Sequence, residues 1–185
     1  MPLTLHAATV PSLLQVLRGA LGWLDKAAQF AADQGIAESA IMEARLSPDM
    51  FPFNRQGRGF AMHAPGGIAG AMKGSFSPEM TPPPENFTGL EERVGEAIAY
   101  LEGVEPAAME ELVGKPMWFE FKEVRVPYTA DQFLLSFSQP NFYFHATTAY
   151  AILRHLGVEV GKGDYLGQLR TSSAPAALEL PASFD

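Results

Sequence analysis

The apolar residues near the start of the chain recur at intervals of three and four. An α-helix turns by about 100° per residue, so this spacing places them along one face of a helix. Pro11 suits a first helical turn and Gly35 is a typical C-terminal stop, so we expect a helix over residues 10–34 and a short one over 37–45. Such a face must be buried against other elements. The stripe consists of Val10, Leu13, Leu14, Leu17, Leu21, Leu24, Ala28 and Ala31.

A second long helix is expected to begin near Phe53. Its apolar residues keep a helical spacing as far as Met72, but the same stretch contains several glycines and Pro65. Glycine costs about 1 kcal/mol in a helix interior and proline about 3 kcal/mol. We therefore predict a helix that is kinked or broken near Pro65, followed by a proline-rich connection over residues 74–87.

Two further helical segments are predicted in the second half of the chain. Thr88 with Glu91 three residues later is typical of a capping box, so a third helix should begin at Thr88, with a short helix over 105–113 after it. The last helix should begin after Thr129, be divided by Pro140 into residues 130–138 and 140–156, and end at Gly157.

A different pattern separates these two helices. Residues 118–121 and 124–126 are rich in aromatic and β-branched side chains and flank Lys122 and Glu123, which predicts a small β-hairpin over 117–128. The fold class expected is all-α, a four-helix bundle with a small β-hairpin before the last helix. We expect one domain over residues 1–170 and a loosely ordered tail over 171–185.

Composition excludes several classes of function. Hydrophobic residues make up 47% of the chain and charged residues 18%, which indicates a globular protein rather than a disordered one. The formal net charge is −8 and the basic residues are scattered, so nucleic acid is not expected as a partner. The chain has no cysteine, which excludes disulfides and thiolate metal sites. Without a signal-type or membrane-length apolar run, we expect a cytoplasmic protein with no membrane partner.

Several blocks of the chain resemble an uncharacterised bacterial domain-of-unknown-function family that is grouped with the DinB/YfiT-like four-helix bundles. The resemblance covers residues 3–168. Its most specific part is the run from Pro140 to His155. The other blocks are Val10 to Leu13, Ala44 to Pro52, Arg55 with Gln56, and Gly161 to Gly167.

The resemblance implies a DinB-like fold and raises the question of a metal. DinB-like relatives often bind a divalent ion through one histidine on the second helix and two histidines spaced four apart on the last, and some transfer groups to or from low-molecular-weight thiols. In this chain His145 lies on the last predicted helix and His63 on the second, but position 149 is Ala149. His63 and His145 are therefore the candidate ligands for Zn, Ni, Mn or Fe.

Polar residues on the last predicted helix suggest a ligand pocket inside the bundle. At 100° per residue, Asn141, His145 and Thr148 lie on one side of that helix. An unpaired buried polar group costs about 1–3 kcal/mol. Either a ligand uses these groups, or Asn141 and His145 bond to backbone groups that Pro140 leaves open. Both interpretations stay open. The candidate pocket residues are Asn141, Tyr143, His145, Thr148, Arg55 and Gln56.

Three hypotheses for function follow. The first is a small-molecule-binding bundle with a divergent or vestigial DinB-like metal site. The second is a metal-dependent transferase of the DinB-like type, which needs a third metal ligand. The third is a structural or interaction homodimer without catalysis. The sequence leaves open whether the protein is an enzyme.

Overall fold

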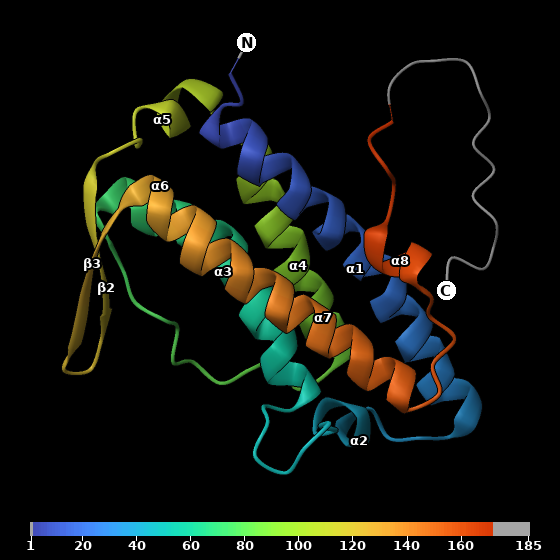
Figure 1. Ribbon diagram of the computed structural model, residues 1–185. Helices are drawn as coiled ribbons and strands as arrows, with labels where there is room; N and C mark the ends of the chain where they lie inside the picture. The colour runs from blue at the N-terminus through green and yellow to red at the C-terminus, as the bar shows by residue number, and fades with distance from the viewer. Residues whose placement is uncertain (1, 172–185) are drawn as a thin grey trace.

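Four long helical units pack into a bundle in the computed structural model, of which residues 2–171 are described here (Figure 1). The first three are α1 (Leu5–Gln34), α3 (Phe53–Lys73) and α4 (Phe87–Glu102). The fourth is a continuous stretch made of α6 (Ala130–Phe133), the π-helix η1 (Leu134–Ser138) and α7 (Gln139–His155). Short helices connect or flank these units: α2 (Glu38–Met42), α5 (Pro106–Glu110) and α8 (Lys162–Leu166). The predicted four-helix bundle is confirmed.

Helix α1 begins one turn earlier than predicted. Thr4 is its N-cap, and the Thr4 side chain accepts a hydrogen bond from the backbone N–H of Ala7. Pro11 therefore lies inside the helix and not in its first turn. Pro11 leaves the carbonyl of Ala7 without its usual donor, and water can replace that donor because Ala7 is exposed. Gly35 ends the helix with a φ of 64°, as expected.

Helix α3 is continuous across Pro65, so the predicted break is wrong. Much of the helix is buried between its neighbours, and the side chains of Phe60 and Ile68 have no exposed surface. Burying such a side chain contributes about 1.5–3 kcal/mol, which offsets the low helix propensity of the glycines. The start of α4 also differs, because its cap is Asn86 rather than Thr88. The Asn86 side chain accepts a 2.8 Å hydrogen bond from the N–H of Gly89.

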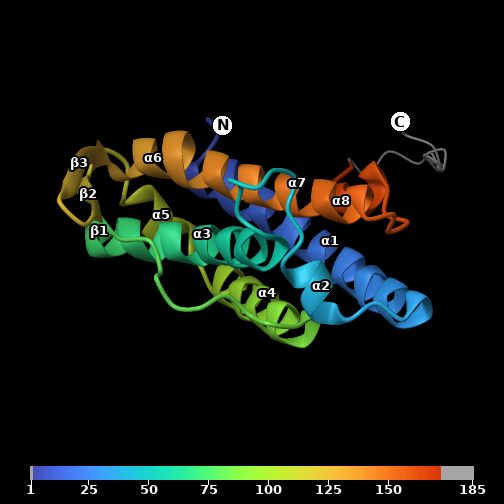
Figure 2. The same ribbon diagram turned by 90° about the horizontal axis from the view of Figure 1, so that it is seen from below.

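The predicted hairpin is part of a three-stranded sheet at one end of the bundle (Figure 2). Strands β2 (Pro116–Phe121) and β3 (Val124–Thr129) pair antiparallel and turn at Lys122, whose φ is 52°. A third strand, β1 (Ser75–Phe76), follows α3 and pairs in parallel with β2, with Ser75 opposite Trp118. Strand β1 was not predicted, because two residues are too few to show an alternating pattern. Pairing β1 with β2 fixes the buried Phe76 ring beside the end of α3.

The last helical stretch changes its winding where Pro140 disturbs the hydrogen-bond ladder. The N–H of Gln139 bonds to the carbonyl of Leu134, five residues back, and an α-helix would use four. At the predicted division the helix is not interrupted. A π-turn lies immediately before Pro140, and the helical segments on either side of it are continuous. Within residues 2–171 no helix is long and apolar enough to cross a membrane.

Candidate functional site

A hydrogen-bonded chain connects α7 to α3 and fixes the orientation of His145. The Nδ1 atom of His145 lies 2.7 Å from Oε1 of Gln56, and Nε2 of Gln56 donates to the carbonyl of Phe51 at 3.1 Å. A carbonyl only accepts, so the Gln56 amide must point its nitrogen at Phe51 and its oxygen at His145. The proton of a neutral His145 therefore sits on Nδ1. The Nε2 atom keeps a lone pair that can accept a hydrogen bond or take a proton.

His63 lies next to His145 and is more deeply buried. The two imidazole rings are 5.7 Å apart between centroids and 19° from parallel. His63 is 6% exposed, and its Nδ1 atom is buried with no hydrogen-bond partner among residues 2–171. Its ring also contacts Phe76 from β1 and Phe137 from η1, at centroid distances of 5.5 and 6.1 Å. The sheet and the π-turn thus form the apolar surroundings of this histidine.

Two glycines on α3 allow α7 and η1 to approach this closely. A Cβ atom added at Gly59 would lie 2.7 Å from Cγ of His145, which is too short for any real contact. One turn past His63, the missing Cβ of Gly67 leaves room for Ser138. The Ser138 hydroxyl donates a 2.9 Å hydrogen bond to the carbonyl of His63. The glycines that counted against a helix in the sequence are therefore the contact points of the site.

Both histidines are neutral at pH 7. Burial, with a smaller contribution from the nearby His145, lowers the pKa of His63 to about 3. Burial also lowers the pKa of His145 to about 4, and the positive charge of Arg58 acts in the same direction. Burial disfavours the charged form of an imidazole because it removes the ion from water. The site therefore offers uncharged ring nitrogens and not imidazolium ions.

Arg58 is a residue of the site that the sequence analysis did not single out. It is half-buried on α3, directly before Gly59, and its guanidinium donates to the carbonyl of Thr81 in the segment over residues 77–86. Its Nε atom is buried and finds no hydrogen-bond partner in the described part of the chain. Burial lowers the pKa of Arg58, Glu79 raises it, and Arg55 and Arg93 lower it. No pattern in the sequence places Arg58 near a histidine 87 positions away, because that depends on how the helices pack.

The structure brings together only some of the predicted pocket residues. Gln56, His63 and His145 meet, whereas Asn141 and Thr148 donate to backbone carbonyls of their own helical stretch, at 2.7 Å each. The backbone alternative therefore holds for Asn141 but not for His145, whose partner is the side chain of Gln56. The Tyr143 hydroxyl accepts a 3.4 Å hydrogen bond from Gln139. Arg55 is exposed, with its guanidinium 5.5 Å from the ring centre of Phe51.

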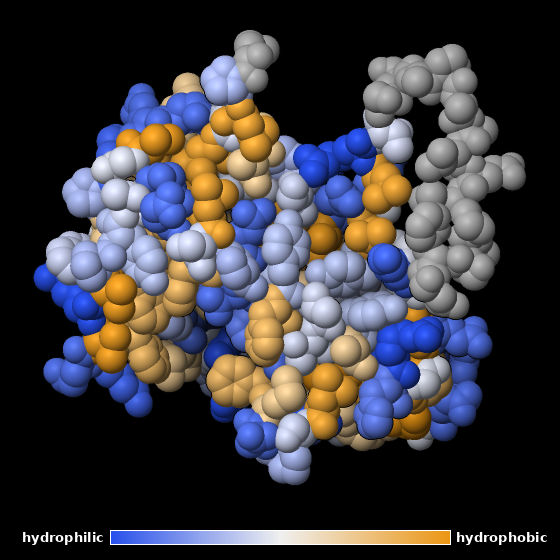
Figure 3. Space-filling model, viewed as in Figure 1, coloured by the Kyte–Doolittle hydropathy of each residue, from blue (hydrophilic) through white to orange (hydrophobic). Residues whose placement is uncertain are grey.

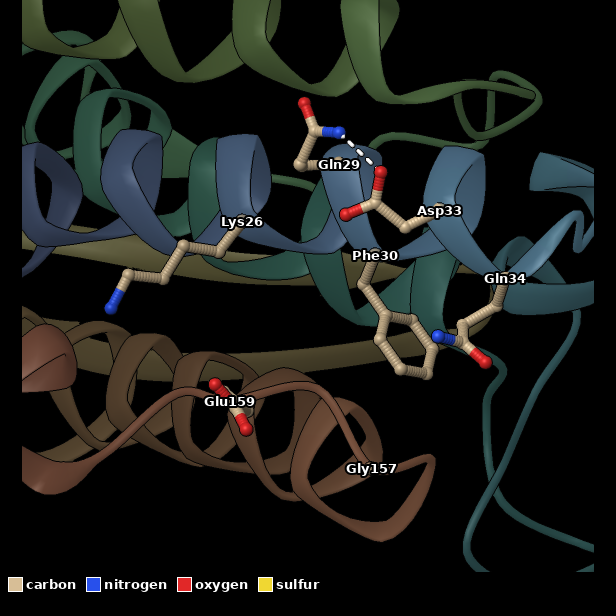
Figure 4. Close-up of a pocket in the computed structure, with 7 residues that line it drawn as sticks. All are labelled: Lys26, Gln29, Phe30, Asp33, Gln34, Gly157 and Glu159. Carbon is tan, nitrogen blue, oxygen red and sulfur yellow. Dashed lines mark hydrogen bonds between the residues drawn. The ribbon is translucent and has the colours of Figure 1, made fainter.

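The surface is hollowed in more than one place. The space-filling view shows one hollow with hydrophilic atoms inside it, between α7 and the segment that follows β1 (Figure 3). A separate groove of about 430 Å³ lies between α1 and the chain after α7 (Figure 4). Lys26 at its edge is paired with Asp164 at 2.7 Å, and Gln29 is bonded to Asp33. That second groove contains none of the predicted site residues. Its lining is Lys26, Gln29, Phe30, Asp33, Gln34, Gly157 and Glu159.

Comparisons with known proteins agree with this architecture. The model of the domain of unknown function DUF1993 matches residues 5–166. The chain belongs to the DUF1993 family. A crystal structure of a DinB family member protein from Shewanella denitrificans is similar, with 29% sequence identity and a TM-score of 0.77, covering 92% of this chain and 96% of that one. No curated protein matches. The predicted resemblance to DinB-like bundles of unknown function is confirmed.

The donor set of this DUF1993 chain does not fit the three-histidine site that the resemblance implies. Ala149, where the pattern would place the third histidine, is completely buried and offers no donor atom. Within residues 2–171 no group of three or more His, Cys, Asp or Glu side chains could hold a metal ion. The orphaned Nδ1 of His63 and the free Nε2 of His145 would supply two ligands at most, where structural and catalytic zinc sites use three or four from the protein.

Proposed function

We propose that this DUF1993 protein binds a small molecule in the hollow beside α7, with Nε2 of His145 as the acceptor for a donor group of the ligand. The observation that carries the proposal is the chain from the Phe51 carbonyl through Gln56 to His145. A buried amide that fixes one imidazole tautomer is the kind of support that binding and catalytic histidines receive. Gln56 is only 1% exposed, so solvent does not perturb this orientation.

A binding screen with a variant of His145 tests the proposal. Small thiols, alcohols, amines and carboxylates are added to the isotope-labelled protein, and the side-chain nitrogen signals of His145 are followed by NMR. We expect at least one compound to shift these signals in a saturable way. The same compound should lose its binding to His145→Gln, in which the ring is replaced. If every compound that binds does so equally well to this variant, the proposed site is wrong.

The metal-dependent transferase is the main rival. Its support is that a metal-bound histidine commonly donates its second nitrogen to a carbonyl or carboxylate, as His145 donates to Gln56. Elemental mass spectrometry of protein purified without a His-tag, with His145→Ala alongside, separates the two. We expect less than stoichiometric metal in the wild type. Stoichiometric Zn, Ni, Mn or Fe that is absent from the variant would favour the transferase.

A homodimer is the third candidate, because large apolar side chains are exposed on the last helical stretch. Phe144 is 56% exposed and Leu135 is 40% exposed. Static light scattering of the purified protein measures the oligomeric state directly. A dimer that persists on dilution and dissociates in Phe144→Ser would support the interaction hypothesis, and a monomer at all concentrations would contradict it.

A further inference from the structure

We infer that the hollow between α7 and the segment over residues 77–86 binds an organic anion, through a carboxylate or phosphate group held by Arg58, and that this preference replaces the divalent cation of metal-binding DinB-like sites. The inference rests on the proposed function and names its class of ligand. It depends on the position of Arg58, on its missing anionic partner and on the uncharged state of its neighbours.

Arg58 lies close enough to His145 for its positive charge to lower the pKa of that histidine. Gly59, the next residue, is the point at which α3 contacts the His145 ring. On the other side, the guanidinium reaches the carbonyl of Thr81, so it lies between α3 and the segment over residues 77–86. Figure 3 shows the surface hollowed between that segment and α7.

The charge of Arg58 is incompletely balanced. No carboxylate of the described residues forms an ion pair with Arg58, whereas Arg18, Arg45, Arg93 and Arg125 each have one. The nearby Glu79 is already bonded to Arg93 and to the hydroxyl of Thr81. In a protein of net charge −8, this is a local excess of positive charge.

The surroundings of Arg58 favour an anion over a metal ion. A half-buried guanidinium attracts a carboxylate or phosphate strongly, because it presents several N–H donors in a fixed fork. The same charge repels a divalent cation beside His145, where screening by water is weakened. Arg55, one turn earlier on α3, lines a different surface groove together with Asp49 and Glu85. Arg58 is the arginine whose charge acts on His145. The ring of Phe144 stands 5.5 Å from His145 and offers an apolar wall to the body of the ligand.

The test uses two anions and a metal ion as probes of the full-length protein. Sodium benzoate, inorganic phosphate and Zn²⁺ are titrated separately at constant ionic strength, and the side-chain signals of His145 are followed by NMR. We expect saturable binding of benzoate or phosphate and none of Zn²⁺. Benzoate alone would indicate a carboxylate ligand, and phosphate alone a phosphorylated one. No binding of either anion at tens of millimolar, or stoichiometric Zn²⁺ binding at His145, would overturn the inference.

Variants of Arg58 test whether this side chain binds the anion. Arg58→Gln should weaken binding about tenfold or more, as expected for the loss of a charged hydrogen bond. Arg125→Gln removes the same charge from the hairpin, where Arg125 pairs with Glu120, and should bind like the wild type. If Arg58→Gln does not fold by circular dichroism, Arg58→Lys keeps the charge but loses the fork and should still bind about threefold more weakly. Unchanged affinity in a folded Arg58 variant contradicts the inference.

This result is separable from failure of the proposed function. If neutral compounds bind in a His145-dependent way but benzoate and phosphate do not bind, only the inference of an anionic ligand is refuted. Loss of all His145-dependent binding would refute both.

Discussion

At the scale of single residues, the site depends on Gln56 more than on any group that a motif search would find. Gln56 contacts both the Phe51 carbonyl and His145. The Phe51 carbonyl fixes the orientation of the Gln56 amide, and the amide oxygen in turn selects the Nδ1-protonated tautomer of His145. Gln56 was among the predicted pocket residues, beside Arg55 near the start of the second predicted helix. Its pairing with a residue 89 positions away required the structure.

Replacing Gln56 with methionine should release the tautomer of His145. The side chain keeps its length but loses both hydrogen bonds, so the proton is free to occupy either ring nitrogen. Long-range proton–nitrogen NMR should show this mixture, and chemical denaturation should show a loss of about 1–3 kcal/mol. Gln29→Met on the exposed face of α1 is the matched control and should change neither quantity. A His145 that keeps its Nδ1 proton in Gln56→Met would show that another group orients it.

The lowered histidine pKa values predict a loss of stability in acid. In the unfolded chain a histidine has a pKa near 6.5, whereas in the folded protein the values are about 3 for His63 and about 4 for His145. Between pH 6.5 and 4 the unfolded state binds protons that the folded state does not. The free energy of unfolding therefore decreases as the pH is lowered through this range. Each such histidine contributes a slope of at most about 1.4 kcal/mol per pH unit. His145→Gln should therefore show a shallower slope than the wild type in urea unfolding measured from pH 6 to 4.5, and equal slopes would contradict the assignment.

At the scale of elements, periodicity predicted the four helical units because each buries one long apolar face. Periodicity failed where tertiary packing determines the local structure. Pro65 and the glycines of α3 counted against a helix in the sequence, yet α3 runs unbroken because its small residues admit α7. The strand β1 was not predicted because its two residues show no alternating pattern and its partner β2 lies about 40 residues further along the chain. Register between distant segments also explains why Arg58 and Ser138 were not predicted at the site.

A methyl group at Gly59 should force α3 and α7 apart. Its Cβ would lie within 3 Å of three atoms of the His145 ring, so Gly59→Ala should lower the free energy of unfolding by about 1–3 kcal/mol despite the higher helix propensity of alanine. Gly22 lies inside α1 with nothing within 4 Å of an added Cβ. Gly22→Ala should therefore raise stability by up to about 1 kcal/mol. Chemical denaturation measures the free energy of unfolding of both variants. If both substitutions change it in the same direction, the contact at Gly59 is not tight.

At the scale of the whole molecule, one apolar core runs from α1 to α7. Trp23 lies in its centre without exposed surface and meets the rings of Phe53 and Phe60 edge to face. The predicted single domain stays a prediction, as do the homodimer and the cytoplasmic location. The predicted tail over residues 171–185 lies outside the described residues, apart from Thr171.

Unfolding followed at Trp23 tests the single domain. In Trp118→Phe, the fluorescence comes from Trp23 alone, while circular dichroism reports all helices. A single domain of this size should unfold in one cooperative step, so the two signals should give the same urea midpoint. Wild-type midpoints serve as the control. Two separated transitions would show that part of the bundle unfolds independently.

The close contacts along α3 also limit how this site can evolve. Side chains larger than hydrogen collide with His145 at position 59, with Ser138 at 67 and with Leu90 at 57, so these three positions cannot vary without disturbing the bundle. The exposed segment over residues 77–86 has fewer such restrictions. Mutational drift and directed evolution should therefore alter ligand preference mainly through that segment. Libraries that randomise it should yield more folded, functionally diverse variants than libraries on α3.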